Sequence, residues 1–237
     1  MIIANFQNTK IMMKKLFFSM LAGMMALGAM AQESKFTVKG TFENFNDSVV
    51  FSLIDLESSE NIASQAIAVT GKMSEFSCDL KDAALLYIVE RNGNRTHYTP
   101  VPAIPGETLL VYQDHNGVTH YGGSQFYVDY DEAEQIVRPF FNDMVENMKH
   151  QYGVYGPMSK EELEYYSKQY CDLVNAMEEA VLRYVKAHPD QDAAAALMYQ
   201  LDNKGIERAE AMLTERARNS VAANLYKAAR ALLLKRQ

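Results

Sequence analysis

The periodicity of the apolar residues changes once along this chain, close to Ser124. Between about residues 34 and 121, apolar side chains recur at every second position, and beyond residue 124 they recur at every third or fourth position. Period two is typical of half-buried strands, whereas the longer period is typical of amphipathic helices. The sequence therefore predicts an α+β fold: an N-terminal antiparallel β-sandwich or open barrel of about eight strands over 32–123, followed by a C-terminal helical bundle over 124–237.

Turn-forming residues separate the predicted strands. The strongest of these signals is Asn116-Gly117, because Asn-Gly between extended segments favours a two-residue type I′ hairpin. Such a turn pairs His115 with Val118 and places His115 and His120 on the same face of the hairpin. Further turns are expected at Asn46-Asp47, Gly71, Asn92-Gly93-Asn94 and Pro105-Gly106.

A capping box formed by Ser159 and Glu162 predicts the start of a helix of some 28 residues, which Pro189 ends. Three shorter helices are expected after it, over 193–201, 206–217 and 220–234. Gly205 is expected to end the first of these three. Pro139 lies inside the preceding helical pattern and predicts a kink or a break, because an internal proline costs a continuous helix about 3 kcal/mol.

The first 31 residues have the pattern of a secretory signal peptide. In order, the segment contains the basic pair Lys14-Lys15, the apolar run 16–28, and the small residues Ala29 and Ala31. An apolar run of about 13 residues is too short to span a bilayer, which takes about 20 residues. A lipid anchor would require a cysteine at the first mature position, where Gln32 stands. We therefore expect cleavage between Ala31 and Gln32, export to the periplasm, and no stable membrane anchor.

The charge of the chain argues against two classes of partner. Three of the 23 basic residues and none of the 30 acidic residues lie in the first 31 positions, so residues 32–237 carry a net charge of −10. An acidic chain is a poor partner for nucleic acid or for anionic membranes. Residues 203–237 are the exception, with eight basic and three acidic side chains. We expect this segment to pack against the acidic body, with a partner-binding patch as the alternative.

The predicted strand region carries a set of strand and turn motifs: Phe36-Thr37-Val38-Lys39-Gly40, Gly71-Lys72-Met73, Pro105-Gly106-Glu107 and Gly123-Ser124. In these motifs, over about residues 34–124, the chain resembles domain of unknown function 4369. The resemblance implies the N-terminal module of exported bacterial thioredoxin-like thiol-disulfide proteins, and the segment with His188-Pro189-Asp190 resembles the linker that follows it. We expect the thioredoxin-like domain to be missing, because the chain stops at Gln237 and contains no Cys-x-x-Cys motif.

The two cysteines do not form a redox motif. Thiol redox chemistry needs a thiolate with a resolving thiol close by, and Cys78 and Cys171 are 93 positions apart. Cys78 alternates in phase with Phe76 and Leu80, which predicts a small residue of the core. A structural disulfide between Cys78 and Cys171 is the alternative, and it would stabilise the fold by about 4 to 5 kcal/mol.

No other candidate forms a complete catalytic or metal site. His115 and His120 supply two possible metal ligands but no third, so we expect solvent-facing histidines and no metal. The segment 122–124 lacks the Gly-x-Ser-x-Gly pattern and is interpreted as the start of the first helix. The acidic pairs Glu161-Glu162 and Glu178-Glu179 are interpreted as solvated helix faces rather than as a glycosidase dyad.

Aromatic residues gather near the predicted boundary of the two halves: Phe126, Tyr127, Tyr130, Tyr152, Tyr155, Tyr165, Tyr166 and Tyr170. We expect most of them to seal the sheet against the helices, with a groove for a partner as the alternative.

These patterns together predict a protein that is not an enzyme and has no cofactor. We expect an envelope accessory or binding module, whose partner is an envelope protein or a client polypeptide. Two alternatives remain open. One is a remnant or separately encoded fragment of a thiol-disulfide oxidoreductase, and the other is a surface or adhesion protein built on the sandwich.

Overall fold

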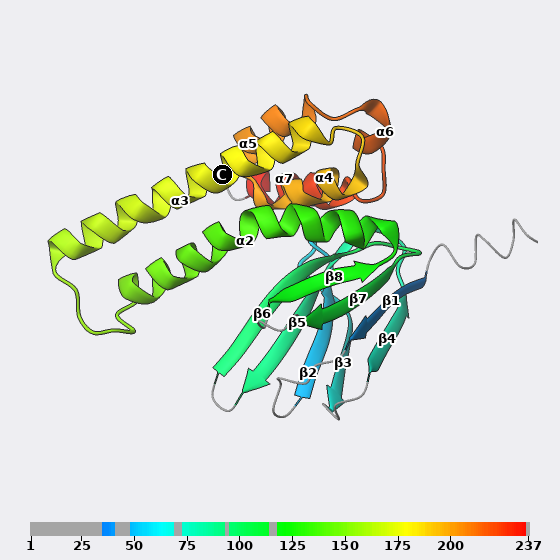
Figure 1. Cartoon of the computed structure of the whole chain (residues 1–237), viewed down its shortest axis with the longest axis horizontal. Helices are drawn as coiled ribbons and strands as arrows, with labels where there is room; N and C mark the ends of the chain where they lie inside the picture. Colours follow the sequence, from blue (N-terminus) through cyan, green and yellow to red (C-terminus); the bar gives the residue numbers. More distant parts are fainter. Residues whose placement is uncertain (1–34, 41–47, 69–72, 93–94, 114–117, 236–237) are drawn as a thin grey trace, which may run out of the picture.

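The structure is a computed structural model that describes residues 35–40, 48–68, 73–92, 95–113 and 118–235. Eight strands precede the helices, which confirms the predicted α+β order (Figure 1). Among the described residues, none of the helices combines the length and the apolar character that a membrane span requires. The predicted signal peptide, with Ala31 and Gln32, lies outside the described residues.

The strands form two four-stranded sheets that pack as a β-sandwich. Sheet A has the order β4 (Ser74–Asp79), β1 (Lys35–Gly40), β7 (Thr108–Gln113), β8 (Thr119–Gly123). Sheet B has the order β3 (Asn61–Ala68), β2 (Ser48–Ile54), β5 (Ala84–Asn92), β6 (Arg95–Ala103). The two sheets share one core, in which Phe51 of β2 stacks on Phe76 of β4 with ring centroids 5.9 Å apart.

One pair of neighbouring strands is parallel. β1 lies between β4 and β7, antiparallel to the first and parallel to the second. The other described pairs are antiparallel. Alternating apolar residues predict which face of a strand is buried but not the direction of its neighbour. The parallel pair of β1 and β7 therefore departs from the predicted antiparallel pairing.

The hairpin between β7 and β8 has a different register from the predicted one. Tyr112 pairs with His120 and Gln113 pairs with Thr119, whereas a two-residue Asn-Gly turn would pair Gln113 with His120. The predicted register is therefore wrong by one residue, and such a shift moves side chains to the opposite face. His115 lies outside the described residues.

The helical half contains two long helices and several short ones. They are α2 (Gln125–Gln151), α3 (Lys160–Ala187), α4 (Asp192–Leu197), the 3₁₀ turn η1 (Met198–Gln200), α5 (Asn203–Glu210), α6 (Glu215–Arg218) and α7 (Asn224–Lys235). The capping box of Ser159 and Glu162 is present, and α3 has the predicted 28 residues before His188 and Pro189. Of the kink or break predicted at Pro139, the break is absent, because Pro139 lies inside a continuous α2. The helix changes direction part-way along its length (Figure 1).

Gly205 lies inside α5, so the prediction that it ends a helix is wrong. A Cβ atom at this position would lie 3.2 Å from Cβ of Leu201 and 3.3 Å from Cδ of Glu178 in α3. The glycine therefore permits the close approach of α5 to α3. The single helix predicted over 206–217 is also interrupted, because Thr214 caps a separate short helix, α6.

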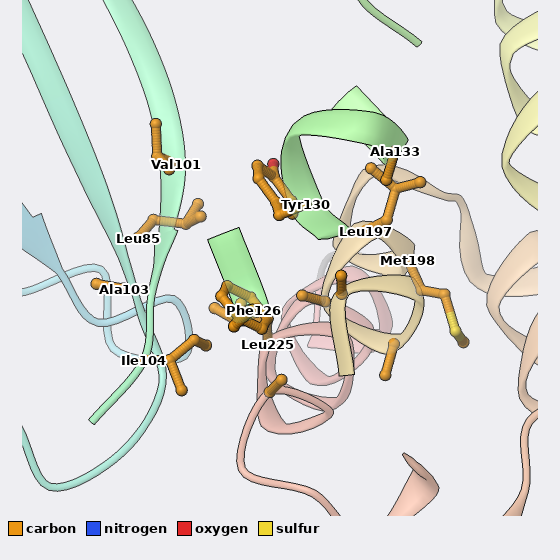
Figure 2. Close-up of a cluster of buried hydrophobic side chains, with 14 of the residues drawn as sticks. Leu85, Val101, Ala103, Ile104, Phe126, Tyr130, Ala133, Leu197, Met198 and Leu225 are labelled. Atoms are coloured by element: carbon orange, nitrogen blue, oxygen red, sulfur yellow. The ribbon is translucent and has the colours of Figure 1, made fainter. Parts of the chain in front are cut away.

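The first half of α2 joins the sandwich to the other helices. Figure 2 shows Phe126 and Tyr130 between side chains of sheet B, such as Leu85, and side chains of the later helices, such as Leu197 and Leu225. Phe126, Tyr127 and Tyr130 are all buried. For these three aromatic residues, the predicted sealing of the sheet against the helices is confirmed.

The basic C-terminal segment pairs with acidic residues of the body, as predicted. Arg208 binds Glu178 and Glu179 at 2.8 and 2.9 Å. Arg216 binds Asp190 and Asp192 of the α3–α4 connection and α4 at 2.9 and 3.0 Å, and Lys235 binds Glu57 of the sandwich at 3.1 Å. These ion pairs connect the last helices to the acidic part of the chain.

Candidate functional site

The outer part of the α2–α3 hairpin extends beyond the body of the protein (Figure 1). The buried residues of α3 are confined to its C-terminal third, from Met177 to Val185. In α2 they lie between Phe126 and Val137, apart from Met144 and Asn147. Residues 141–172, here called the distal hairpin, thus have few neighbours other than each other.

The end of α2 is an ordered turn that leaves an apolar side chain in solvent. The amide N–H of Gly153 donates to the carbonyl oxygen of His150, and that of Val154 donates to that of Lys149, both at 2.9 Å. This is a Schellman motif, which requires the φ of +69° that Gly153 adopts. In such a motif, the residue that follows the glycine commonly packs against the last turn of the helix. Val154 occupies this position, yet its side chain is 64% exposed.

A polar network fixes the register of the two helices in the distal hairpin. Asn147 is buried between them, and its Nδ2 donates to Oε1 of Gln169 in α3 at 2.9 Å. Nε2 of Gln151 donates to Oδ1 of Asn147 at 2.6 Å and to the carbonyl oxygen of Tyr166 at 3.3 Å. A buried asparagine between helices favours a single alignment, because any other leaves its amide without partners.

Four rings form an aromatic cluster on the distal hairpin: His150, Tyr155, Tyr165 and Tyr166. The imidazole of His150 stacks on Tyr166 with centroids 4.4 Å apart and lies 4.6 Å from Tyr155. Tyr165 meets the edge of Tyr166 at 5.3 Å. The hydroxyl of Tyr155 donates to the carboxylate of Glu146. Helix contacts and ring contacts therefore hold the cluster in one arrangement.

The distal hairpin is the part of the described chain where exposed apolar side chains are most concentrated. Of the 14 large apolar side chains that are exposed in the described residues, six lie between positions 141 and 165. They are Phe141, Tyr152, Val154, Tyr155, Leu163 and Tyr165. Exposed apolar side chains gathered in one part of a structure point to a site of interaction.

The location predicted for several tyrosines is consequently wrong. Tyr152, Tyr155, Tyr165 and Tyr166 lie on the distal hairpin and not at the boundary of sheet and helices. Tyr152 is 82% exposed and Tyr165 is 62% exposed. The sequence could not predict their location, because the apolar stripes of α2 and α3 continue beyond the part of each helix that packs on the rest of the protein.

The distal hairpin carries more acidic than basic side chains. It contains six acids and three lysines. Each lysine is already paired with an acid of the same hairpin: Lys149 with Glu146, Lys160 with Glu164, and Lys168 with Asp172. Hydrogen bonds from Lys149 and Tyr155 lower the pKa of Glu146 and keep it ionised. The aromatic cluster therefore lies in a negatively charged setting.

His120 belongs to a second group of polar side chains, between β8 and α2. Its Nδ1 lies 2.9 Å from Oδ2 of Asp131, and its ring stacks on Tyr112 at 5.5 Å. Oδ1 of Asp131 accepts a hydrogen bond of 2.8 Å from the amide of Tyr121. His120, predicted to face solvent, is partly exposed, with 25% of its side chain accessible. Asp131 was missed because it lies on a helix that follows the hairpin.

Glu134 lies deeper in the same region and links three elements. Its carboxylate accepts hydrogen bonds from Tyr130 at 3.4 Å and from Gln200 of η1 at 3.5 Å, and lies 4.0 Å from Nε of Arg138. Arg138 in turn donates to the carbonyl oxygen of Thr119 in β8. Burial raises the pKa of Glu134 to about 7, against the opposing effect of Arg138. We interpret this group as a structural link between the sandwich and the helices.

The remaining candidates are separate from one another. Cys78 in β4 and Cys171 in α3 are both free thiols; Cys171 is exposed, and burial followed by the charge of Asp79 raises the pKa of Cys78. Ser124 stands directly before α2, as predicted. In the described part of the chain, no group of three or more His, Cys, Asp or Glu side chains is arranged to hold a metal ion.

The acidic pairs also have structural partners. Glu162 belongs to the capping box of α3, and Glu178 and Glu179 both bind Arg208.

Comparison with known proteins gives no match. No family model matches the chain, and neither a curated protein nor a solved structure matches it. The resemblance to domain of unknown function 4369 stays a prediction. The candidate site consequently rests on the geometry of the distal hairpin alone.

Proposed function

We propose that the chain is a non-enzymatic accessory module, exported to the periplasm, that binds a partner polypeptide through the distal hairpin. The observation that carries this proposal is an aromatic cluster that is both exposed and fixed in place. A partner that covers large apolar side chains removes them from water, which favours binding by about 25 cal/mol per Å² of apolar surface buried. Tyrosine is also enriched among the residues that dominate binding at protein interfaces.

The rigidity of the distal hairpin supports the proposal. Association costs free energy because side chains and loops at an interface lose conformational freedom. The network around Asn147, the stacking of His150 on Tyr166 and the tilted contact of His150 with Tyr155 order these side chains before a partner arrives. A pre-ordered surface loses less entropy on binding.

The alternative function, a fragment of a thiol-disulfide oxidoreductase, has less support. Reactive thiols need a lowered pKa and a partner thiol nearby. Cys78 has the opposite property, a raised pKa, and it lies in β4 of the sandwich, whereas Cys171 lies in α3. These features favour the binding module.

Selection of ligands from a library of displayed random peptides tests the proposed function. The target is the chain from Gln32 onward, and the counter-target is the double variant Tyr155→Ser/Tyr165→Ser. We expect enriched peptides to bind the parent about tenfold or more tightly than the variant. The matched control is Tyr98→Ser, which removes an exposed tyrosine from β6 and should leave binding unchanged.

Three outcomes would contradict the proposed function. The first is that the enriched peptides bind the parent and the double variant equally well, and the second is that no peptide is enriched. The third is that the chain reduces the disulfides of insulin and that Cys78→Ser or Cys171→Ser abolishes this activity. Circular dichroism of the double variant checks that it retains the fold, which is expected because both tyrosines are exposed.

A further inference from the structure

The charge of the distal hairpin indicates the chemistry of its partner. All three lysines of this segment are in ion pairs with acids of the hairpin. Glu162 is engaged in the capping box. The two acids that remain are Asp143 and Glu161, which are exposed and take part in none of the ion pairs found among the described residues. The surplus charge on this surface is therefore negative.

The aromatic rings strengthen the same preference. The face of a tyrosine ring carries partial negative charge and attracts the ammonium of lysine or the guanidinium of arginine. Glu161 precedes Tyr165 by four residues on α3, so the carboxylate and the ring share one face of the helix. Val154 and Leu163 add exposed aliphatic surface to the same end of the hairpin.

We propose that the segment of the partner that contacts the distal hairpin is basic, with lysine or arginine side chains next to apolar ones. This inference rests on the proposed function and names the chemistry of its partner. Cationic groups pair with Asp143, Glu161 and the ring faces, while the apolar groups cover Val154 and the edge of the aromatic cluster.

A second copy of the chain is a poorer occupant of this surface. Two distal hairpins packed against each other would bring together two surfaces with the same net charge of −3. Like charges facing each other across an interface disfavour association. The negative charges that would disfavour a homodimer would instead attract a basic partner.

Three synthetic peptides of equal length test the inference. Each alternates leucine with one other residue, which is lysine in the first, glutamine in the second and glutamate in the third. Fluorescence anisotropy gives Kd for each peptide with the chain from Gln32 onward. We expect the lysine peptide to bind about tenfold or more tightly than the other two, and to bind more weakly when salt is raised from about 50 to about 300 mM.

Matched variants separate local from overall attraction, since the whole mature chain is acidic. Asp143→Asn/Glu161→Gln should raise Kd for the lysine peptide several-fold, about as expected for loss of two surface charges. The control Glu60→Gln/Glu132→Gln removes two exposed acids outside the distal hairpin, so the net charge is the same and Kd should be unchanged. Tyr155→Ser/Tyr165→Ser should raise Kd about tenfold.

The outcomes distinguish this inference from the proposed function. Equal, tyrosine-dependent binding of the lysine and glutamine peptides would overturn the basic partner and leave the proposed function intact. Binding of the lysine peptide that neither the tyrosine nor the acid variant weakens would contradict both. The inference of a basic partner would also be overturned if none of the three peptides bound. A dimer in light scattering that Tyr155→Ser/Tyr165→Ser dissociates would overturn it as well. In either case, the library selection still decides the proposed function.

Discussion

The hydroxyl of Tyr127 in α2 donates a hydrogen bond of 2.7 Å to the carbonyl oxygen of Pro102 in β6. Tyr127 is fully buried, so this bond joins the helical half to sheet B without competition from water. We expect Tyr127→Phe to lower the free energy of unfolding by about 1–2 kcal/mol, measured by urea denaturation. Tyr165→Phe, at an exposed site, should leave it unchanged; equal effects of the two variants would contradict the role of the Tyr127 hydroxyl.

Glu134 should make the stability of the fold depend on pH. Because its pKa rises from 4.5 to about 7 on folding, the folded protein holds a proton that the unfolded chain has lost between those values. The free energy of unfolding then decreases as pH rises through this window. At about pH 8, Glu134→Gln should be more stable than the parent by up to about 3 kcal/mol, and the difference should disappear below about pH 4.5.

The exposed neighbour Glu132 supplies the control for this effect. Glu132→Gln removes an exposed carboxylate from the same helix, so it should not reproduce the gain in stability expected of Glu134→Gln at about pH 8. A difference between Glu134→Gln and the parent that stays constant from about pH 4 to pH 8 would show that Glu134 titrates normally.

Asn147 should control the order of the distal hairpin more than the stability of the whole protein. In Asn147→Ala, the amides of Gln151 and Gln169 lose their shared partner, and the two helices lose the contact that fixes their alignment. Amide hydrogen exchange over 141–172 should become about tenfold faster, with exchange in the sandwich unchanged. Asn142→Ala, at an exposed position on α2, should have no such effect. Faster exchange throughout the protein would argue against a local role.

Gly123 is expected to be the less replaceable of two glycines with positive φ. Its φ is +100°, and a Cβ atom there would lie 2.2 Å from the carbonyl oxygen of Thr108. Gly156 has a φ of +122° but open space around it. Gly123→Ala should destabilise the fold by about 3 kcal/mol or more, whereas Gly156→Ala should cost only the backbone strain, about 1 kcal/mol. Similar thermal midpoints for the two variants would contradict this.

The two thiols should react at different rates. Cys171 is exposed, whereas Cys78 is half-buried and has a raised pKa, so less of it is thiolate near neutral pH. Alkylation of the native protein followed by mass spectrometry should modify Cys171 first and Cys78 more slowly, with two thiols reacting after unfolding. An unfolded, unreduced chain that accepts no alkylating reagent would instead demonstrate the disulfide.

Much of the fold could be predicted because local chemistry determines it. The capping box at Ser159 and the proline at 189 mark the two ends of α3, and both act within a few residues of themselves. The parallel pairing of β1 with β7 could not be predicted, since it depends on segments far apart in sequence. Gly205 misled the prediction for a similar reason, because its role is a contact with another helix.

The candidate site was only partly predictable. The excess of tyrosines was visible in the sequence, but an apolar stripe on a helix does not reveal where the neighbouring body ends. The contact of His120 with Asp131 depends on the hairpin register and on the angle at which α2 crosses β8. Neither of these follows from periodicity.

The position of β1 inside sheet A has a consequence for how the protein is made. A ribosome completes β1 well before β4 and much earlier than β7, the two strands that flank it. Until Thr108 and the residues after it emerge, β1 has at least one open edge that another chain could join. A product truncated before Thr108 would therefore keep this edge open and would be prone to aggregate.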